Sequence, residues 1–415
     1  MKMLVIRVSY FMLAILSILQ IISAGCTRND RNPVGSQLPD EDWFGEGPFI
    51  DTLSTDDELT VMMREGAGAS PFLVVGSHSE LVSRSLIRFL ILPSADSVLA
   101  ARLEFRVHDL IGTDALTVSV YRLTNSDWVE AETTWDLVSG KEGEDPLSWE
   151  TPGGDFDGGA PLSSAEVTTS LIDSTFTVEL EPALISSWID STAENAGLIL
   201  ALENEGSYPG LVEFRSRQMA SAEEFLGPQL YVKYTKAEDP DSVVEGTIVV
   251  TEDATIYRYD GEVPGGSLRV GSVPQFRTFI RFDTSIFSKA TSVRRATLFL
   301  PIIEKAPRER DFTVGAYMIT GDWDADLTPL NFTPLDTVEI GEQDTVALDV
   351  TDIAWGWVSG TIENNGVSIK ASVERGMFGY VDIEGGSVGK DRGPLCIVEY
   401  SQPPSVNRGS KERAR

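Results

Sequence analysis

Three tryptophans and two arginines are the side chains of this 415-residue sequence best suited to recognise a ligand. Trp128, Trp135 and Trp149 fall in or beside expected loops, where an exposed indole ring can stack on the apolar face of a sugar ring. Arg88 and Arg281 lie in the middle of expected strands, and a guanidinium group forms paired hydrogen bonds with carboxylates. Two roles stay open for these arginines: a structural ion pair, or contact with an anionic ligand.

Alternate carboxylates form a second candidate site, for calcium. Asp322, Asp324 and Asp326 supply the hard oxygen ligands that this cation takes. An EF-hand is excluded, because the sixth position of that loop would be Leu327 rather than glycine and the twelfth would be Thr333 rather than glutamate. A structural calcium ion bound in some other loop stays one interpretation.

No pattern nominates a catalytic residue. The segment 385–389 has the spacing of a nucleophile elbow, but His78 and His108 both precede it, whereas that motif needs a later histidine. A carboxylate pair for glycoside hydrolysis is defined by its separation in space, so 64 acidic residues leave such a pair open. A polysaccharide-degrading enzyme is therefore the least favoured interpretation.

Charge and composition exclude other classes. The chain carries 33 basic and 64 acidic residues, a formal net charge of −31, whereas nucleic-acid binding needs a basic face. Two cysteines and two histidines are too few for a disulfide framework or a four-ligand zinc site. With 42% hydrophobic residues the chain can bury real cores, so it is not a disordered acidic tail.

The N-terminus has the pattern of an export signal. Lys2 and Arg7 precede an apolar run over residues 8–22, which at about 15 residues is shorter than a bilayer span. Residues 23–26, Ser-Ala-Gly-Cys, resemble the lipobox of bacterial lipoproteins. The resemblance implies removal of residues 1–25 and acylation of Cys26. An ordinary signal peptide ending in Ala-Gly is the alternative.

The residue after the cysteine bears on localisation. By the sorting habit of that family, Thr27 in place of aspartate implies the bacterial outer membrane, with the lipid-anchored protein facing the periplasm or the cell surface. Residues 26–54 are polar, acidic and rich in proline and glycine, which predicts a disordered tether. Residues 402–415 are predicted to be a disordered tail.

The rest of the chain contains a tandem repeat. Residues 84–89 match residues 277–282, and both segments carry two arginines four positions apart. The other collinear pairs are 101–105 with 296–300, 118–128 with 314–323, 177–200 with 345–369, and 227–234 with 393–400. The repeat predicts one domain over 55–235, a linker over 236–245 and a second domain over 246–401.

The repeated blocks have the pattern of β-strands, because they are short, rich in β-branched and aromatic residues, and alternate in polarity. Helical spacing is confined to residues 182–191 and 351–359. Many short strands separated by turn residues predict an all-β protein with two tandem antiparallel β-sandwich (jelly-roll) domains. Cys396 takes the inward-facing position of Leu230 in the matching strand, which predicts a buried, inert thiol.

Several blocks together resemble the DNRLRE domain, a family that overlaps modules classed as carbohydrate-binding. They are Arg-Ser-Leu-Ile-Arg-Phe from Arg84, Val-Ser-Val-Tyr ending at Tyr121, Asp-Trp-Val-Glu from Asp127, and Gly-Pro-Gln-Leu-Tyr-Val-Lys-Tyr from Gly227. The second copy is more degenerate. The resemblance implies a jelly-roll fold on secreted surface proteins, some of which bind polysaccharide.

The repeat also separates the tryptophans. Trp128 recurs as Trp323 although the flanking loops differ, which favours a packing role, whereas Trp149 has no counterpart and is expected at the surface. Together these observations predict a non-catalytic, lipid-anchored surface protein that binds polysaccharide. The alternative is a structural or adhesive protein that contacts another envelope protein. Nucleic acid is not an expected partner.

Overall fold

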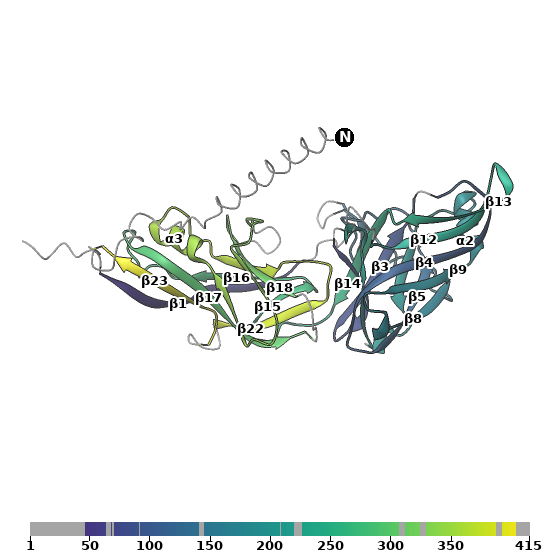
Figure 1. Ribbon diagram of the computed structural model, residues 1–415. Helices are drawn as coiled ribbons and strands as arrows, with labels where there is room; N and C mark the ends of the chain where they lie inside the picture. Colours follow the sequence, from purple (N-terminus) through teal and green to yellow (C-terminus); the bar gives the residue numbers. More distant parts are fainter. Residues whose placement is uncertain are drawn as a thin grey trace, which may run out of the picture. The chain divides into compact units, whose positions relative to one another are not determined.

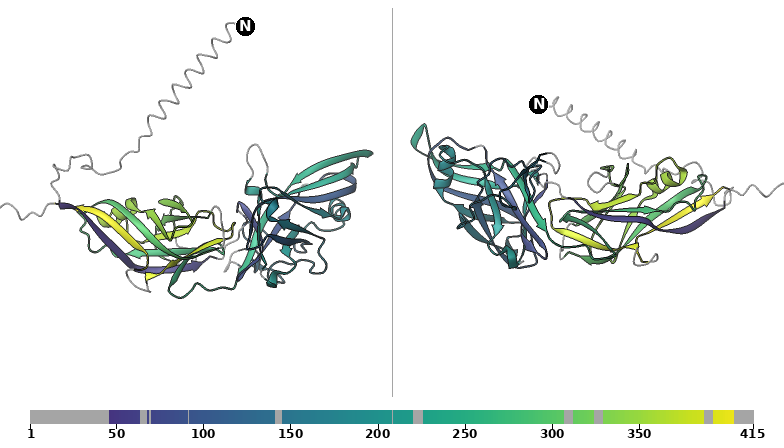
Figure 2. Two further views of the ribbon diagram at one scale, coloured as in Figure 1. Left: turned by 60° about the horizontal axis from the view of Figure 1, so that its bottom comes forward. Right: turned by 180° about the vertical axis from the view of Figure 1, so that it is seen from behind.

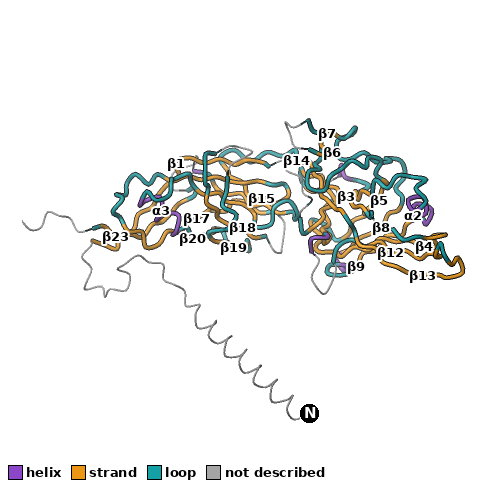
Figure 3. Tube along the Cα trace, turned by 90° about the horizontal axis from the view of Figure 1, so that it is seen from above, coloured by secondary structure: helices purple, strands orange, loops and turns teal. Residues whose placement is uncertain are grey.

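The protein is built from antiparallel β-strands and short helices (Figure 3). The computed structural model describes residues 46–403 except 64–67, 69, 91, 141–144, 208, 220–225, 307–311, 324–328 and 387–391. The predicted all-β class with antiparallel sandwich packing is confirmed. The predicted signal peptide, Cys26 and residues 404–415 lie outside the described residues.

The first sandwich has two sheets that share one long strand, β4 (Ala95–Ile111). Its other strands are β2 (Phe72–His78), β3 (Leu81–Arg88), β5 (Ala115–Arg122), β6 (Leu137–Ser139), β7 (Leu147–Ser148), β8 (Ser163–Thr168), β9 (Thr175–Leu180), β10 (Leu198–Leu202), β11 (Gly210–Arg215), β12 (Gln229–Lys236), β13 (Asp239–Val249) and β14 (Glu252–Tyr259). The first half of β4 pairs with β9 and β12, and the second half pairs with β11. Alternate side chains of β4, including Leu103, Phe105 and Val107, are therefore buried between the sheets.

The second sandwich repeats this plan around β17 (Ser292–Lys305). Its other strands are β1 (Glu46–Met62), β15 (Ser267–Val273), β16 (Phe276–Phe282), β18 (Thr313–Met318), β19 (Asp336–Glu339), β20 (Thr345–Asp349), β21 (Val367–Ala371), β22 (Gly379–Glu384) and β23 (Leu395–Gln402). The helices α2 (Pro182–Ile189) and α3 (Thr351–Ser359) occupy matching places and bury Trp188 and Trp357. Cys396 is fully buried in the second core, and burial raises the pKa of its thiol to about 12, as expected of an inert thiol.

The first strand of each repeat lies in the other repeat's sandwich. Strand β1 pairs with β16, with Thr60 opposite Thr278, while β14 pairs with β3, with Thr255 opposite Ser85. Strand β13, which precedes β14, pairs with β12. As a result, the purple β1 lies beside the yellow β23, which comes from the other end of the described chain (Figure 1, Figure 2).

The same side-chain contacts hold both exchanged strands. Thr60 Oγ1 accepts a hydrogen bond from the backbone N–H of Arg269 at 3.1 Å. Thr255 Oγ1 accepts one from the backbone N–H of Val74, also at 3.1 Å. Val74 and Arg269 are equivalent positions of the repeat, as are Thr60 and Thr255. The exchange is therefore reciprocal.

The exchange overturns two predicted boundaries. Residues 236–245 form a hairpin between β12 and β13 rather than a linker, and residues 46–54 belong to β1 rather than to a tether. The hairpin is favoured physically, because two residues join β12 to β13 and a strand pairs most readily with its neighbour in sequence. Strand β1 then has its partners in the second sandwich.

This topology predicts which fragment folds alone. Residues 68–260 contain every strand of the first sandwich, whereas residues 68–235 lack β13 and β14 and leave the edge of β3 unpaired. We expect urea unfolding, followed by tryptophan fluorescence, to show residues 68–260 more stable by at least about 3 kcal/mol, because Ala254 and Ile256 are buried in this fragment alone. Equal stability would contradict the assignment of β14 to this sandwich.

Candidate functional site

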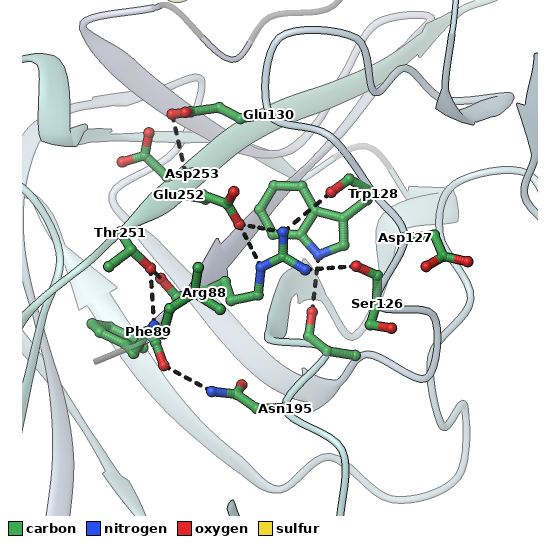
Figure 4. Close-up of polar contacts among 12 residues, drawn as sticks. Arg88, Phe89, Ser126, Asp127, Trp128, Glu130, Asn195, Thr251, Glu252 and Asp253 are labelled. Atoms are coloured by element: carbon green, nitrogen blue, oxygen red, sulfur yellow. Dashed lines mark hydrogen bonds and ion pairs between the residues drawn. The ribbon is translucent and has the colours of Figure 1, made fainter. Parts of the chain in front are cut away.

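Arg88, the last residue of β3, is a structural clamp that holds the first residues of the long loop between β5 and β8, residues 123–162 (Figure 4). Its guanidinium group forms an ion pair with Glu252 of β14 and donates hydrogen bonds to the carbonyl oxygens of Ser126, at 2.6 Å, and Trp128, at 3.2 Å. It also lies 4.5 Å from the centre of the Trp128 ring. Since Arg88 is 8% exposed and its donors are occupied, the structural interpretation is the one the contacts support.

Arg281 has the equivalent place in the second sandwich. It forms an ion pair with Asp57 of β1 at 2.9 Å and lies 5.3 Å from the ring of Trp323. This pair is much more exposed, with 37% of the arginine side chain and 51% of the aspartate side chain accessible. The clamp is thus built twice, and in each case its carboxylate comes from an exchanged strand.

The three tryptophans of the long loop are buried together rather than exposed. Trp128, Trp135 and Trp149 are 1%, 7% and 5% exposed and pack with Ala254 and Ile256 in one apolar cluster. The indole N–H groups of Trp128 and Trp149 donate to the carbonyl oxygens of Ala196 and Thr134, both at 2.9 Å. The expectation that Trp149 lies at the surface is therefore wrong, because the loop folds its tryptophans over the outer face of β14 and β3.

A buried acid lies beside this cluster. Asp253 of β14 is 1% exposed, and one of its carboxylate oxygens accepts from the backbone N–H of Arg217 at 2.7 Å. Its other oxygen has no hydrogen-bond partner among the described residues. Burial raises the pKa of Asp253 to about 7, and the nearby carboxylate of Glu130 adds to that rise. Glu130 itself is held by Arg217 through two hydrogen bonds, at 2.7 and 2.6 Å.

The structure gives no support to a metal site in its described part. Asp322 is exposed, while Asp324 and Asp326 lie outside the described residues. Across the described ranges, no group of three or more histidine, cysteine, aspartate or glutamate side chains is placed to hold a metal ion. Asp155, another acid of the long loop, accepts from the backbone N–H groups of Glu150 and Thr151 and so organises the loop itself. A structural calcium ion stays a prediction.

A cleft of about 440 Å³ lies beside β14 where the long loop ends against it. We call it the β14 cleft, and its lining consists of residues 255–260, residues 133–137, Met62, Met63 and Pro152. This volume falls within the range of sites for small-molecule ligands or short segments of a polymer. Trp135 is the one predicted ligand-binding tryptophan that lines the cleft.

The β14 cleft combines aromatic rings with exposed charges. Tyr257 and Tyr259 are half-buried, and their hydroxyl oxygens accept from Gln275 N and Arg269 Nη1 at 3.2 and 2.5 Å. Arg258 lies 5.5 Å from the centre of the Trp135 ring and pairs with Asp260 at 2.9 Å. The exposed donors and acceptors are thus the side chains of Arg258, Asp260 and Asp136. Such a lining can hydrogen-bond hydroxyl groups while the rings cover apolar faces.

Two glutamates and two asparagines that hold neighbouring arginines and carbonyl groups were not predicted from the sequence. Arg84 pairs with Glu205 at 2.7 Å, and Arg277 pairs with Glu374 at 2.7 Å in the second sandwich. Asn195 and Asn364 donate to the carbonyl oxygens of Phe89 and Phe282, at 2.7 and 2.8 Å. Glu205 with Glu374, and Asn195 with Asn364, each lie 169 positions apart, as do the matched glycines 197 and 366. This shared spacing outside the strands is the sequence signal that marks the two glutamates and two asparagines as equivalent positions of the repeat.

Comparisons with known proteins do not assign a family. No family model and no curated protein matches the chain. Among solved structures, a chain of the T=1 particles derived from infectious bursal virus is 10% identical, with 87% of this chain and 77% of that chain covered and a TM-score of 0.12. A TM-score this low carries no argument about fold or function. The described residues contain no helix long and apolar enough to cross a membrane.

The raised pKa of Asp253 predicts a pH dependence of stability. The folded protein keeps a proton that the unfolded chain releases above the ordinary pKa of 3.8, so the free energy of unfolding falls as the pH rises from about 4 to 7. Asp253→Asn removes this loss, and we expect it to stabilise the protein by about 4 kcal/mol at pH 8 and little at pH 4. Urea unfolding at both pH values measures the difference.

A matched control is Asp260→Asn, which changes an exposed aspartate just after the same strand. It should leave the pH dependence of the parent protein in place. If Asp253→Asn retained the parent's fall in stability between pH 4 and pH 8, the buried carboxyl would not be its source.

Proposed function

We propose that the protein is a non-catalytic, lipid-anchored surface protein of a bacterium that binds polysaccharide in the β14 cleft. The observation that carries the proposal is the lining of this cleft, which includes Tyr257, Tyr259 and Trp135 together with exposed hydrogen-bonding side chains. Carbohydrate ligands offer both apolar ring faces and many hydroxyl groups, so they match a site of this composition. The resemblance of the repeats to DNRLRE domains supports the same ligand class.

The charge of the cleft points to the kind of polysaccharide. Asp136 and Asp260 contribute two exposed carboxylates against the one guanidinium group of Arg258, on a protein with a formal net charge of −31. An acidic polymer would be repelled by this surface, whereas a neutral one would not. We therefore assign neutral polysaccharide as the ligand. In this proposal the protein itself is anchored in the periplasm or at the cell surface through acylated Cys26.

The test is retention of residues 27–415 on a panel of neutral and acidic polysaccharides, comparing Arg258→Ala with Arg102→Ala. Both arginines are exposed or half-exposed, pair with a carboxylate two positions on, and lie over an aromatic ring, but Arg102 is remote from the cleft lining. We expect Arg258→Ala to weaken binding at least about fivefold, because its hydrogen bonds to the ligand are lost, and Arg102→Ala to bind as the parent does.

Equal binding by both variants would remove the β14 cleft from the proposal. Retention on no polysaccharide would contradict glycan binding altogether and favour the structural or adhesive alternative. Release of sugar products in the same tubes would contradict the non-catalytic assignment.

A further inference from the structure

The two exchanged strands are covered to very different degrees. In β14 the side chains of Asp253, Ala254, Thr255 and Ile256 are all buried. Leu59 of β1, at the position equivalent to Ala254, is 41% exposed. Strand β14 is covered because the tryptophans of the long loop between β5 and β8 pack on its outer face. Strand β1 has no such cover from the described residues of its sandwich.

Polar contacts at the surface hold β1 in place. Asp57 pairs with Arg281 in an exposed ion pair, and Asp51 accepts from the hydroxyl group of Tyr400 at 2.6 Å. Thr60 contacts Thr278 through their hydroxyl groups at 3.0 Å. Apart from Leu53, which is 5% exposed, the described side chains of β1 from Ile50 to Met62 are exposed or half-exposed. Contacts of this kind each stabilise little in water, so the backbone ladders with β16 and β23 contribute most.

The connectivity adds to the contrast. Strand β14 directly follows the β12–β13 hairpin, so the strand before it in sequence and its partner β3 belong to one sandwich, and residues 260–266 then lead to β15 of the second. Strand β1 is joined to the first sandwich through residues 63–71 but pairs with residues 276–282 of the second. None of its pairing contacts depends on that connection, so β1 of another molecule can make them equally well.

We propose that the second sandwich is a strand acceptor, and that β1 of one molecule completes the second sandwich of another copy. In the donated β1, Asp57 pairs with Arg281, Thr60 contacts Thr278 and Leu53 enters the core. The register is the same as when β1 pairs within its own chain. Within one chain the connection keeps β1 at a high effective concentration, so exchange between copies grows with protein concentration. The first sandwich takes no part, because β14 stays with its own chain.

Cysteine pairs test this in residues 27–415 with Cys396→Leu, which supplies the residue of the matching position, Leu230. Chains with Thr60→Cys alone and chains with Thr278→Cys alone are mixed at rising concentration and oxidised. The control mixture carries Thr255→Cys and Ser85→Cys, the equivalent cross-strand pair of the first sandwich. We expect disulfide-linked heterodimers to be at least about tenfold more abundant in the first mixture than in the control.

A chain that carries both Thr60→Cys and Thr278→Cys checks the register and should close an internal disulfide when dilute. If it does so while the mixed single variants give no more heterodimer than the control mixture, β1 never leaves its own chain and the proposal fails. If the doubly substituted chain forms no internal disulfide, the pairing of β1 with β16 is itself contradicted, and the proposal falls with it.

Discussion

Strands at the edge of a sheet carry backbone N–H and C=O groups that need partners, and in this protein β3 and β16 meet that need with strands from the opposite repeat. The two-residue hairpin between β12 and β13 commits residues 239–259 to the first sandwich. In the second sandwich, β23 takes the place of β12 and pairs with β1, which therefore completes this sandwich. Both sandwiches, and the β14 cleft, depend on this arrangement.

The candidate site contains residues that only the exchanged strand β14 brings to it. Glu252, which fixes Arg88, and Arg258, which lines the β14 cleft, both belong to the segment that the sequence assigns to the second repeat. The long loop of the first repeat then packs its tryptophans against Ala254 and Ile256 of that segment. The cleft therefore joins residues of both repeats. Since the described residues of the second sandwich do not cover β1 in this way, the second sandwich need not share its function.

Much of the fold could be predicted from the sequence, because alternation and repeat spacing are local properties. The core position of Cys396 follows from its match with Leu230, and the ion pair of Arg88 is one of the two roles that its place in a strand leaves open. The partner of each first strand could not be predicted, since either edge, β3 or β16, suits either strand equally well. Trp149 was misplaced for a related reason, because its burial depends on β14, a strand assigned to the wrong sandwich.

The most direct test of the exchange is to remove β1 and see which edge becomes exposed. Hydrogen exchange, followed by mass spectrometry, would compare residues 27–415 with residues 63–415. We expect the amides of residues 276–282 to lose protection while those of residues 81–88 keep it, because β1 pairs with β16 and β14 pairs with β3. Loss of protection over residues 81–88, with residues 276–282 unchanged, would show that each repeat keeps its own first strand and would contradict this account.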